Sequence, residues 1–366
     1  MSKKGKVLVA MSGGIDSSVT AMLLHEQGYE VIGVTMKTWD YSSSGGKKKS
    51  TGCCSLDDIN DARILAVNMG FHHIIIDIRE EFGSFIVNNF VDEYLAGRTP
   101  NPCVLCNTHI KWDALLKRAD QLGCEFIATG HYAQIRQENG RYVISKGVDE
   151  WKDQSYVLWG LTQESLARTI FPLGGFKKSE IREMAMERGY KELAQKSESY
   201  EICFIPDNDY RGFLKRKVEG LEEKVANGDF VDTQGNVLGK HKGYPFYTIG
   251  QRKGLEIALG EPMYVVEIDA PNNRVVLGTK EDLKKQQMVV KNPNLIKYAE
   301  IPEDIDVVTK IRYKDKGTLS SVKKLDNDCL EVSFYEPVQG IAPGQSAVFY
   351  EGSDLLGGGF IAKPQE

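Results

Sequence analysis

The residues best suited to chemistry lie near the N-terminus, in the run SGGIDSS at 12–18. The run follows an apolar segment with the pattern of a short strand and precedes apolar residues at helical spacing. Its two glycines let the backbone approach an anion closely, Ser17 and Ser18 add hydroxyl donors, and the unpaired N–H groups of a first helical turn point at the same place. The run therefore predicts a phosphate-binding loop. The simpler alternative is a Gly-Ser turn that leads into a helix.

The loop is not a Walker loop, because no Gly-x-x-x-x-Gly-Lys-Ser/Thr run occurs in the chain. Asp16 lies inside it instead, where a carboxylate beside phosphates is best explained as a ligand of Mg²⁺ brought in by a nucleotide. The order of residues resembles the loop of the PP-loop ATP pyrophosphatases, which split ATP into AMP and pyrophosphate to adenylate an oxygen of a substrate. This resemblance implies ATP and Mg²⁺ as cofactors.

Cysteines form the second set of candidate reactive residues. The chain has seven, an odd number that predicts free thiols. Cys106 stands at the predicted start of a helix, where the helix dipole would stabilise its thiolate, and Cys203 follows a polar approach in an apolar run. Two separated thiols and one activated carbon are what sulfur transfer requires. The alternatives are inert core cysteines or half a zinc site, although the adjacent Cys53 and Cys54 have the wrong spacing for a zinc knuckle.

Length and composition limit the class of protein. A chain of 366 residues exceeds one ordinary core, and 41% hydrophobic with 27% charged residues is typical of soluble proteins. No signal-type apolar region or 18-residue apolar stretch occurs, so we expect a cytoplasmic protein with no membrane partner. The net charge of −5 gives no global attraction to nucleic acid, so any RNA-binding surface must be local.

The elements that must position these residues alternate along the first half of the chain. Apolar strands are predicted at about 7–10, 31–36, 73–78 and 126–130, with helices near 17–27, 57–69, 83–95 and 107–122. This order predicts an α/β fold, a doubly wound parallel sheet whose ligands lie at the carboxyl ends of the strands. Asn139-Gly140 predicts a hairpin turn, and Ser179 to Gly189 a capped helix.

The pattern changes after about residue 207. A short helix from Tyr210 to Val218 and a hairpin around Pro271 are predicted, and alternation from 283 onward predicts a small antiparallel barrel or sandwich. The expected domains are 1–207, the PP-loop type catalytic domain; 208–282, a small mainly-β central domain; and 283–366, a C-terminal β-barrel. The basic segment at 41–51 is expected to be a mobile, solvated loop.

Six motifs occur in the order found in the tRNA-specific 2-thiouridylases (the MnmA/TrmU family), and the chain resembles that family over essentially its whole length. The motifs are SGGIDSS at 12–18, NPCVLCN at 101–107, ATGHYA at 128–133, KDQSY at 152–156, EICFIP at 201–206 and GKHKGYPFYTIGQRKGL at 239–255, followed by PGQSAVFY at 343–350. The family replaces the 2-oxygen of the wobble uridine of tRNA by sulfur.

The resemblance implies roles for particular residues. ATP would be held by Ala10, Met11, Ser12, Gly13, Gly14, Ile15, Asp16 and Ser17, with Met36 and Gly130 at the adenosine. Cys203 would carry a persulfide supplied by a cysteine desulfurase or a relay protein, and its terminal sulfur would attack the adenylated base. Cys106 would free the transferred sulfur, either by attacking the persulfide or by assisting release of hydrogen sulfide, and leave a catalytic Cys106–Cys203 disulfide that is later reduced.

The resemblance also implies contacts with tRNA and none with DNA. The matching positions are Asn101, Pro102, Cys103, His131, Lys152, Asp153, Gln154, Arg312, Tyr313 and Gln345. Arg312 and Tyr313, expected on a strand, could give phosphate and stacking contacts. The family often has an acidic residue at the position of Cys103, which leaves the base contact there open and allows Cys103 to compete with Cys106 for the disulfide.

Two other classes of protein remain as alternatives. Amidating and ligating enzymes with the same loop, such as GMP synthetase, argininosuccinate synthetase or tRNA lysidine synthetase, use nitrogen nucleophiles and need no cysteine pair. A non-catalytic RNA-binding module with a structural zinc would bind metal stoichiometrically and release no pyrophosphate.

Overall fold

The computed structural model describes residues 4–39, 56–196, 202–257, 260–302, 305–325 and 328–363. The predicted basic loop, Cys53 and Cys54 lie outside these ranges. The chain forms two compact units. The first contains Met1–Ile86, Cys103–Asn208 and Ser353–Leu356, and the second contains Val87–Pro102, Asp209–Gly352 and Gly357–Glu366. The predicted domain boundaries after residues 207 and 282 stay predictions.

A parallel sheet forms the centre of the first unit. Its strands are β1 (Lys6–Ala10), β2 (Glu30–Lys37), β3 (His72–Asp77), β4 (Phe126–Ala128) and β7 (Thr169–Ile170), in the order β3-β2-β1-β4-β7. All four neighbouring pairs are parallel, which confirms the predicted doubly wound α/β fold. The chain order reverses between β1 and β4, and ligands of such sheets bind at this switch point.

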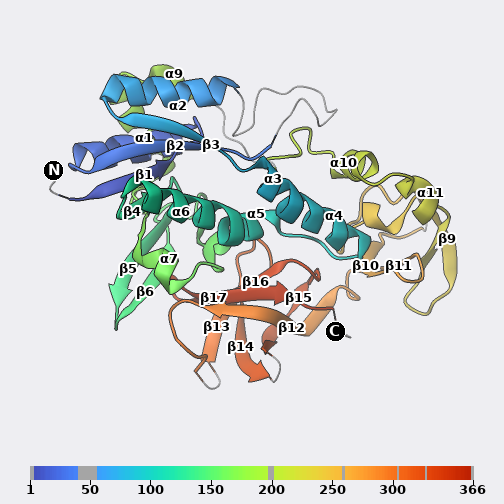
Figure 1. The fold of residues 1–366 in the computed structure, drawn as a ribbon. Coiled ribbons are helices and arrows are strands. Elements are labelled where there is room, and N and C mark those ends of the chain that lie inside the picture. Colours follow the sequence, from blue (N-terminus) through green and yellow to red (C-terminus); the bar gives the residue numbers. More distant parts are fainter. Residues whose placement is uncertain are drawn as a thin grey trace. The chain divides into compact units, whose positions relative to one another are not determined.

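Helices cover both faces of this sheet (Figure 1). On one face, α1 (Ile15–Glu26), α2 (Leu56–Met69) and α8 (Lys178–Glu187) share a core with Val7 and Val9 of β1. Because strand side chains alternate, the fully buried Leu8 faces the other side, where α6 (Trp112–Leu122) packs on β1 and β4. The short α9 (Lys191–Gln195) packs on α8.

The helix that carries two of the cysteines begins earlier than predicted. A continuous helical stretch runs through α5 (Pro102–Leu105), a π-helical segment (Cys106–Lys111) and α6. Proline favours a first helical position because it needs no N–H partner there. Cys106 therefore lies one turn inside the helix, and the prediction that it stands at the helix N-terminus is wrong. Cys103 occupies the first turn.

Further segments of the first unit complete the connections. The predicted helix at 83–95 is divided into α3 (Arg79–Phe82), a π-helical segment (Gly83–Val87) and, in the second unit, α4 (Asn88–Leu95). The hairpin of β5 (Ala133–Glu138) and β6 (Arg141–Lys146) turns at Asn139 and Gly140, whose φ values of 49° and 79° fit a type I′ turn and confirm that prediction. The 3₁₀ helix Ser155–Leu158 and α7 (Gln163–Ala167) follow.

The second unit contains a small mixed sheet and a barrel. The sheet has the order β10-β11-β8-β9 and consists of β8 (Gly228–Val231), β9 (Val237–His241), β10 (Tyr264–Asp269) and β11 (Arg274–Gly278). Two short helices, α10 (Tyr210–Lys217) and α11 (Leu221–Val225), precede it, and the 3₁₀ helix Tyr244–Phe246 lies between β9 and β10. The predicted helix at 210–218 and the hairpin around Pro271 are thus confirmed.

The C-terminal strands close into a barrel, as predicted. They are β12 (Lys284–Leu295), β13 (Ile305–Lys310), β14 (Thr318–Leu325), β15 (Cys329–Gln339), β16 (Ser346–Glu351) and β17 (Asp354–Ile361). Their order is β12-β15-β14-β13-β16-β17, and β12 also pairs with β17. Arg312 and Tyr313 lie in the turn after β13 and not on a strand, contrary to the prediction. In the described ranges, no helix is long and apolar enough to span a membrane.

Candidate active site

The predicted phosphate loop connects β1 to α1. Gly14 is the N-cap residue of α1 and offers no side-chain acceptor, so the first-turn N–H groups face a prospective ligand without a protein cap. The Ser17 hydroxyl donates to the Gly14 carbonyl at 3.1 Å and accepts from the Ser12 N–H at 3.1 Å. Ser18 is only 1% exposed. These hydroxyls therefore shape the loop, and its backbone is the part suited to phosphate.

Two glycines are required by close approach to neighbouring backbone. Gly13 has a φ of +73°, and a Cβ there would lie 2.1 Å from the Asp58 carbonyl oxygen. A Cβ on Gly130 would lie 2.9 Å from the Ser17 nitrogen, so Gly130 lies directly against the loop. Only glycine avoids both clashes. Met36, the penultimate residue of β2, follows Thr35, whose hydroxyl donates to the Met11 carbonyl at 2.8 Å.

Asp16 is held by two residues that the sequence analysis missed. The Lys178 ammonium donates to its two carboxylate oxygens at 2.7 and 2.8 Å, and the Tyr132 hydroxyl donates at 2.7 Å. The side chain of Lys178 is 9% exposed and that of Asp16 is 34% exposed, so the carboxylate faces the open side of this pair. The tertiary structure thus supplies the loop with the lysine that a Walker motif carries in its own sequence. The only sequence signal was the place of Lys178 beside the predicted capped helix.

A second lysine contacts the loop from the end of α9. Lys196 donates to the Gly13 carbonyl at 3.0 Å and pairs with Asp58 at 2.5 Å and with Asp61 at 2.7 Å. It therefore ties the loop to the first turn of α2. The backbone N–H groups at the start of α1 are therefore the donors suited to the phosphates of a nucleoside triphosphate, because both ammonium groups are paired with carboxylates in this state.

The thiols predicted to transfer sulfur belong to the same compact unit as the loop. Cys106 is 5% exposed and Cys203 is partly exposed. Phe204, beside Cys203, is buried against Trp39 and Phe82, with ring centroids 6.1 and 5.7 Å apart. The predicted catalytic disulfide between Cys106 and Cys203 stays a prediction.

The remaining described cysteines do not form a metal site. Cys103 is an exposed free thiol, Cys124 is buried and Cys329 is partly exposed. Within the part of the chain that the structure describes, no three His, Cys, Asp or Glu side chains are grouped closely enough to hold a metal ion. No described cluster supports the zinc alternative.

Several predicted tRNA-contacting residues of the first unit have structural partners. His131 bonds Thr129 through Nδ1 at 2.8 Å, and burial followed by the charge of Lys111 lowers its pKa to about 3, so the ring is neutral. The Asp153 carboxylate accepts from the Gly147 N–H and from the Ser155 N–H and hydroxyl. Gln154 accepts from the Tyr132 N–H at 3.1 Å. Lys152 has its N–H bonded to the Asp149 carbonyl at 3.0 Å.

The predicted tRNA-contacting residues of the second unit fall into two groups. Arg312 and Tyr313 are exposed, Tyr313 by 40%. Gln345 and Asn101 instead make hydrogen bonds within the unit: Gln345 to the Thr99 and Pro100 carbonyls, and Asn101 to the Ser346 hydroxyl. Pro102 is buried at the helix start. Arg312 and Tyr313 are thus the most exposed of these residues, and the predicted tRNA contacts stay predictions.

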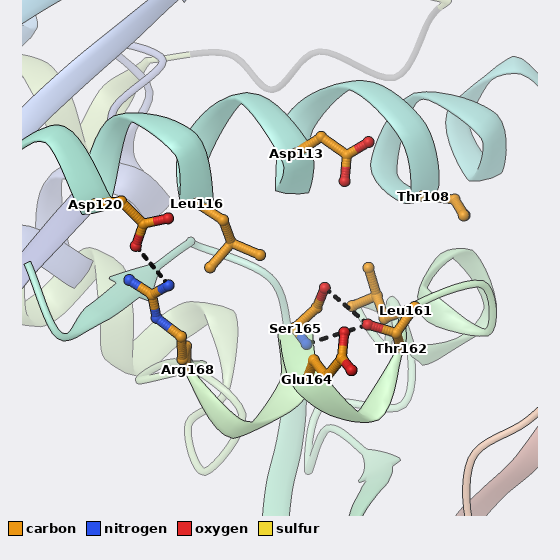
Figure 2. Close-up of a pocket in the computed structure, with 9 residues that line it drawn as sticks. All are labelled: Thr108, Asp113, Leu116, Asp120, Leu161, Thr162, Glu164, Ser165 and Arg168. Atoms are coloured by element: carbon orange, nitrogen blue, oxygen red, sulfur yellow. Dashed lines mark hydrogen bonds and ion pairs between the residues drawn. The ribbon is translucent and has the colours of Figure 1, made fainter.

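A separate pocket of about 390 Å³ lies between α6 and the segment around α7 (Figure 2). Asp113 and Asp120 project from α6, and Arg168 reaches Asp120 across the pocket at 2.7 Å. The pocket is lined by Thr108, Asp113, Leu116, Asp120, Leu161, Thr162, Glu164, Ser165 and Arg168. None of them is a predicted site residue.

Comparison with known proteins defines the class first by its domains. Residues 5–207 match the family model described as tRNA methyl transferase HUP domain. Residues 211–279 match the model described as tRNA methyl transferase PRC-barrel domain, and residues 285–361 match the model described as aminomethyltransferase beta-barrel domain. A solved 4-thiouridine synthetase–RNA complex with bound ATP is similar at 19% identity over 59% of this chain and 51% of that chain, with a TM-score of 0.38, a level that supports no conclusion about function.

Full-length relatives then define the family. The chain is 67% identical to the tRNA-specific 2-thiouridylase MnmA of Amoebophilus asiaticus, over 98% of this chain and 96% of the relative. It is 64% identical to that of Cytophaga hutchinsonii, over 99% and 98%, and 59% identical to that of Salinibacter ruber, over 99% and 95%. The chain belongs to the tRNA-specific 2-thiouridylase family, which confirms both the predicted family and the predicted class of enzyme, a tRNA sulfurtransferase.

Proposed function

We propose that this protein uses ATP to replace the 2-oxygen of the wobble uridine of tRNA by sulfur, through an adenylated base and a persulfide on Cys203. The observation that carries the proposal is that a phosphate-type loop and two cysteines, Cys106 and Cys203, belong to one compact unit. Family membership supports tRNA as the substrate.

The loop is proposed to bind the phosphates of ATP through its backbone N–H groups and Lys178. In the described state Lys178 neutralises Asp16. When phosphates enter, the ammonium would exchange the carboxylate for phosphate oxygens, and Asp16 would then be available to hold Mg²⁺. Bound Mg²⁺ would neutralise phosphate charge. Met36 and Gly130 are proposed to bind the adenosine part, since Gly130 lies against the loop.

Attack by the uracil 2-oxygen on the α-phosphorus forms the adenylate and expels pyrophosphate. This activation is needed because the 2-oxygen alone is a poor leaving group. The terminal sulfur of the Cys203 persulfide then bonds to the base carbon, and AMP leaves with the former 2-oxygen. The Cys106 thiolate attacks the Cys203 Sγ and breaks its bond to the transferred sulfur, which stays on the base. The resulting disulfide accepts two electrons from an external dithiol to restore both thiols.

The sulfur is proposed to arrive from a cysteine desulfurase, directly or through a relay protein. The partial exposure of Cys203 supports this step, because a donor must reach its thiol. The exposed Arg312 and Tyr313 are proposed to contact tRNA phosphate and base, respectively. A cytoplasmic location is part of the proposal, since free thiols and a reducible disulfide suit a reducing compartment.

The test is replacement of Cys203 by Ser, with Cys329→Ser of the barrel as the matched control. With tRNA, ATP and a persulfide source, C203S should still adenylate the tRNA and release pyrophosphate but should neither release AMP by sulfur transfer nor incorporate sulfur, as measured by a pyrophosphate assay and by mass spectrometry of the wobble nucleoside. C329S should behave as wild type. Sulfur incorporation by C203S at the wild-type rate would overturn the proposal, and an aminated or ligated product from wild type would show a nitrogen-ligating enzyme.

A further inference from the structure

A network of hydrogen bonds joins two segments of the second unit, residues 99–101 and residues 343–346, which we call the junction. The Thr99 N–H donates to the Pro343 carbonyl at 2.8 Å. The Gln345 side-chain amide donates to the Pro100 carbonyl at 2.8 Å and to the Thr99 carbonyl at 3.2 Å. The Asn101 amide donates to the Ser346 hydroxyl at 3.3 Å. The barrel thus binds the segment that precedes Cys103 and Cys106 in the chain.

The backbone of the junction is built for this contact. Gly344 has a φ of +87°, and a Cβ there would lie 2.8 Å from the Thr99 carbonyl oxygen. The Gly344 N–H donates to the Ile361 carbonyl at 2.9 Å, and the Ile361 N–H donates to the Gln345 carbonyl at 2.8 Å. The end of β17 therefore holds the backbone of Gln345 in the position from which its side chain contacts residues 99 and 100.

The segment 99–101 depends on outside partners for its own order. Thr99 and Asn101 each precede a proline, and a proline disfavours helical backbone in the residue before it. Both residues are therefore biased toward extended backbone. Extended backbone outside a sheet must find hydrogen-bond partners elsewhere. Gln345 supplies them to two successive carbonyl oxygens.

This use of Gln345 limits what it offers to RNA. A glutamine amide has two N–H donors, and both are engaged by carbonyl oxygens in the junction. Phosphate oxygens only accept hydrogen bonds, so Gln345 cannot bind an RNA phosphate while the junction is intact. The Gln345 amide oxygen is still able to accept a hydrogen bond, for example from a 2′-hydroxyl, so direct contact with RNA is the alternative that a role through residues 99–101 has to be tested against.

We propose that Gln345 is a positioning residue that fixes the conformation of residues 99–101, and with it the start of the helix that continues to Cys103 and Cys106. The catalytic consequence rests on the proposed function, in which this segment meets the target uridine. Disturbing the junction would lower the rate of the chemical step more than the affinity for tRNA.

The first test uses the free protein and needs no substrate. Gln345→Glu removes both donors and places a carboxylate against two carbonyl oxygens, and Gly344→Ala forces the two segments of the junction apart. Gln286→Glu, an exposed position on β12 of the same barrel, is the control with the same change of charge. Hydrogen exchange of the Thr99 amide should become about tenfold faster in Q345E and G344A and stay at the wild-type rate in Q286E. Unchanged exchange in Q345E would overturn the proposal.

The second test measures tRNA affinity and tRNA-dependent AMP formation, in the presence of ATP and a persulfide source, with the same three variants. Q345E should bind tRNA within about threefold of wild type and form AMP about tenfold more slowly at saturating tRNA. Loss of affinity with an unchanged saturated rate would show a direct tRNA contact and overturn the positioning role. If the wild-type protein formed no thiouridine at all, the proposed function would fail, whereas the exchange result would still decide whether Gln345 holds the segment.

Discussion

Lys178 donates hydrogen bonds to both carboxylate oxygens of Asp16, although 162 positions separate the two residues along the chain. The pair places a nearly buried ammonium at the mouth of the phosphate loop. A charged group in such a position is costly to bury unless it has a partner, and phosphate is a partner as good as a carboxylate. The first prediction follows from this relationship.

Replacement of Lys178 by Met should weaken the apparent affinity for ATP by about tenfold or more, because the loop loses its nearest ammonium. It should also lower the free energy of unfolding by about 2 kcal/mol, since Asp16 keeps only the Tyr132 hydroxyl as a side-chain donor. ATP titration of pyrophosphate release and urea unfolding measure the two effects. Lys177→Met, which changes the exposed neighbouring side chain, is the control. Equal ATP affinity in K178M and K177M would contradict the prediction.

Replacement of Gly13 by Ala should abolish ATP binding, whereas Gly28→Ala should not. Both glycines have positive φ, +73° and +90°, so both variants carry about 1 kcal/mol of backbone strain. Only at Gly13 does the new Cβ meet backbone, 2.1 Å from the Asp58 oxygen, whereas nothing lies within 4 Å at Gly28. Calorimetric titration with ATP and thermal melting separate the clash from the strain. A G13A protein that binds ATP as G28A does would show that the loop tolerates displacement.

The cysteines should react with iodoacetamide in an order set by exposure, with Cys103 first, Cys203 next and Cys106 last. Cys103 is exposed and Cys203 partly so, whereas Cys106 is 5% exposed. Desolvation raises the pKa of the Cys103 thiol and slows its reaction near neutral pH, so the rates are compared at alkaline pH, where the thiolate is populated. Peptide mass spectrometry over a time course of the native protein measures each rate, and the denatured protein gives the reference. If Cys106 were modified before Cys103, the thiol inside the helix would have to be reached by local opening, contrary to the described arrangement.

His131 should make stability fall as the pH drops below about 6.5. Burial lowers the pKa of His131 in the folded protein to about 3. Between pH 6.5 and pH 3 the unfolded chain therefore binds a proton at His131 that the folded protein does not bind. The contribution is complete above pH 6.5 and is lost progressively toward pH 3. Urea unfolding between about pH 5 and pH 8 should show a shallower acid-side loss for His131→Gln than for wild type, with His72→Gln, at an exposed position on β3, as the control. Identical slopes for wild type and H131Q would contradict the lowered pKa.

Sequence patterns over a few neighbouring residues predict much of the fold. The strand before SGGIDSS and the helix after it were predicted because apolar periodicity over a few residues decides both. The Asn139-Gly140 turn was predicted because both positions need positive φ. The cysteine helix starts at Pro102, earlier than the predicted start near 107, because a proline favours the first helical position whatever the apolar spacing that follows. Arg312 was placed on a strand because an alternating run shows where a strand is but not the residue at which it ends.

The sequence by itself determined the type of loop, the doubly wound sheet, the barrel and the family, because each is a property of residues near one another in the chain or of motifs in a fixed order. Only the tertiary structure decided that Lys178 neutralises Asp16 and that Gln345 holds residues 99–101, since these partners lie 162 and about 245 positions apart. Hydrogen bonds and charges act over a few ångströms in space, whatever the distance along the chain, and no short pattern records which distant side chain will arrive within that range.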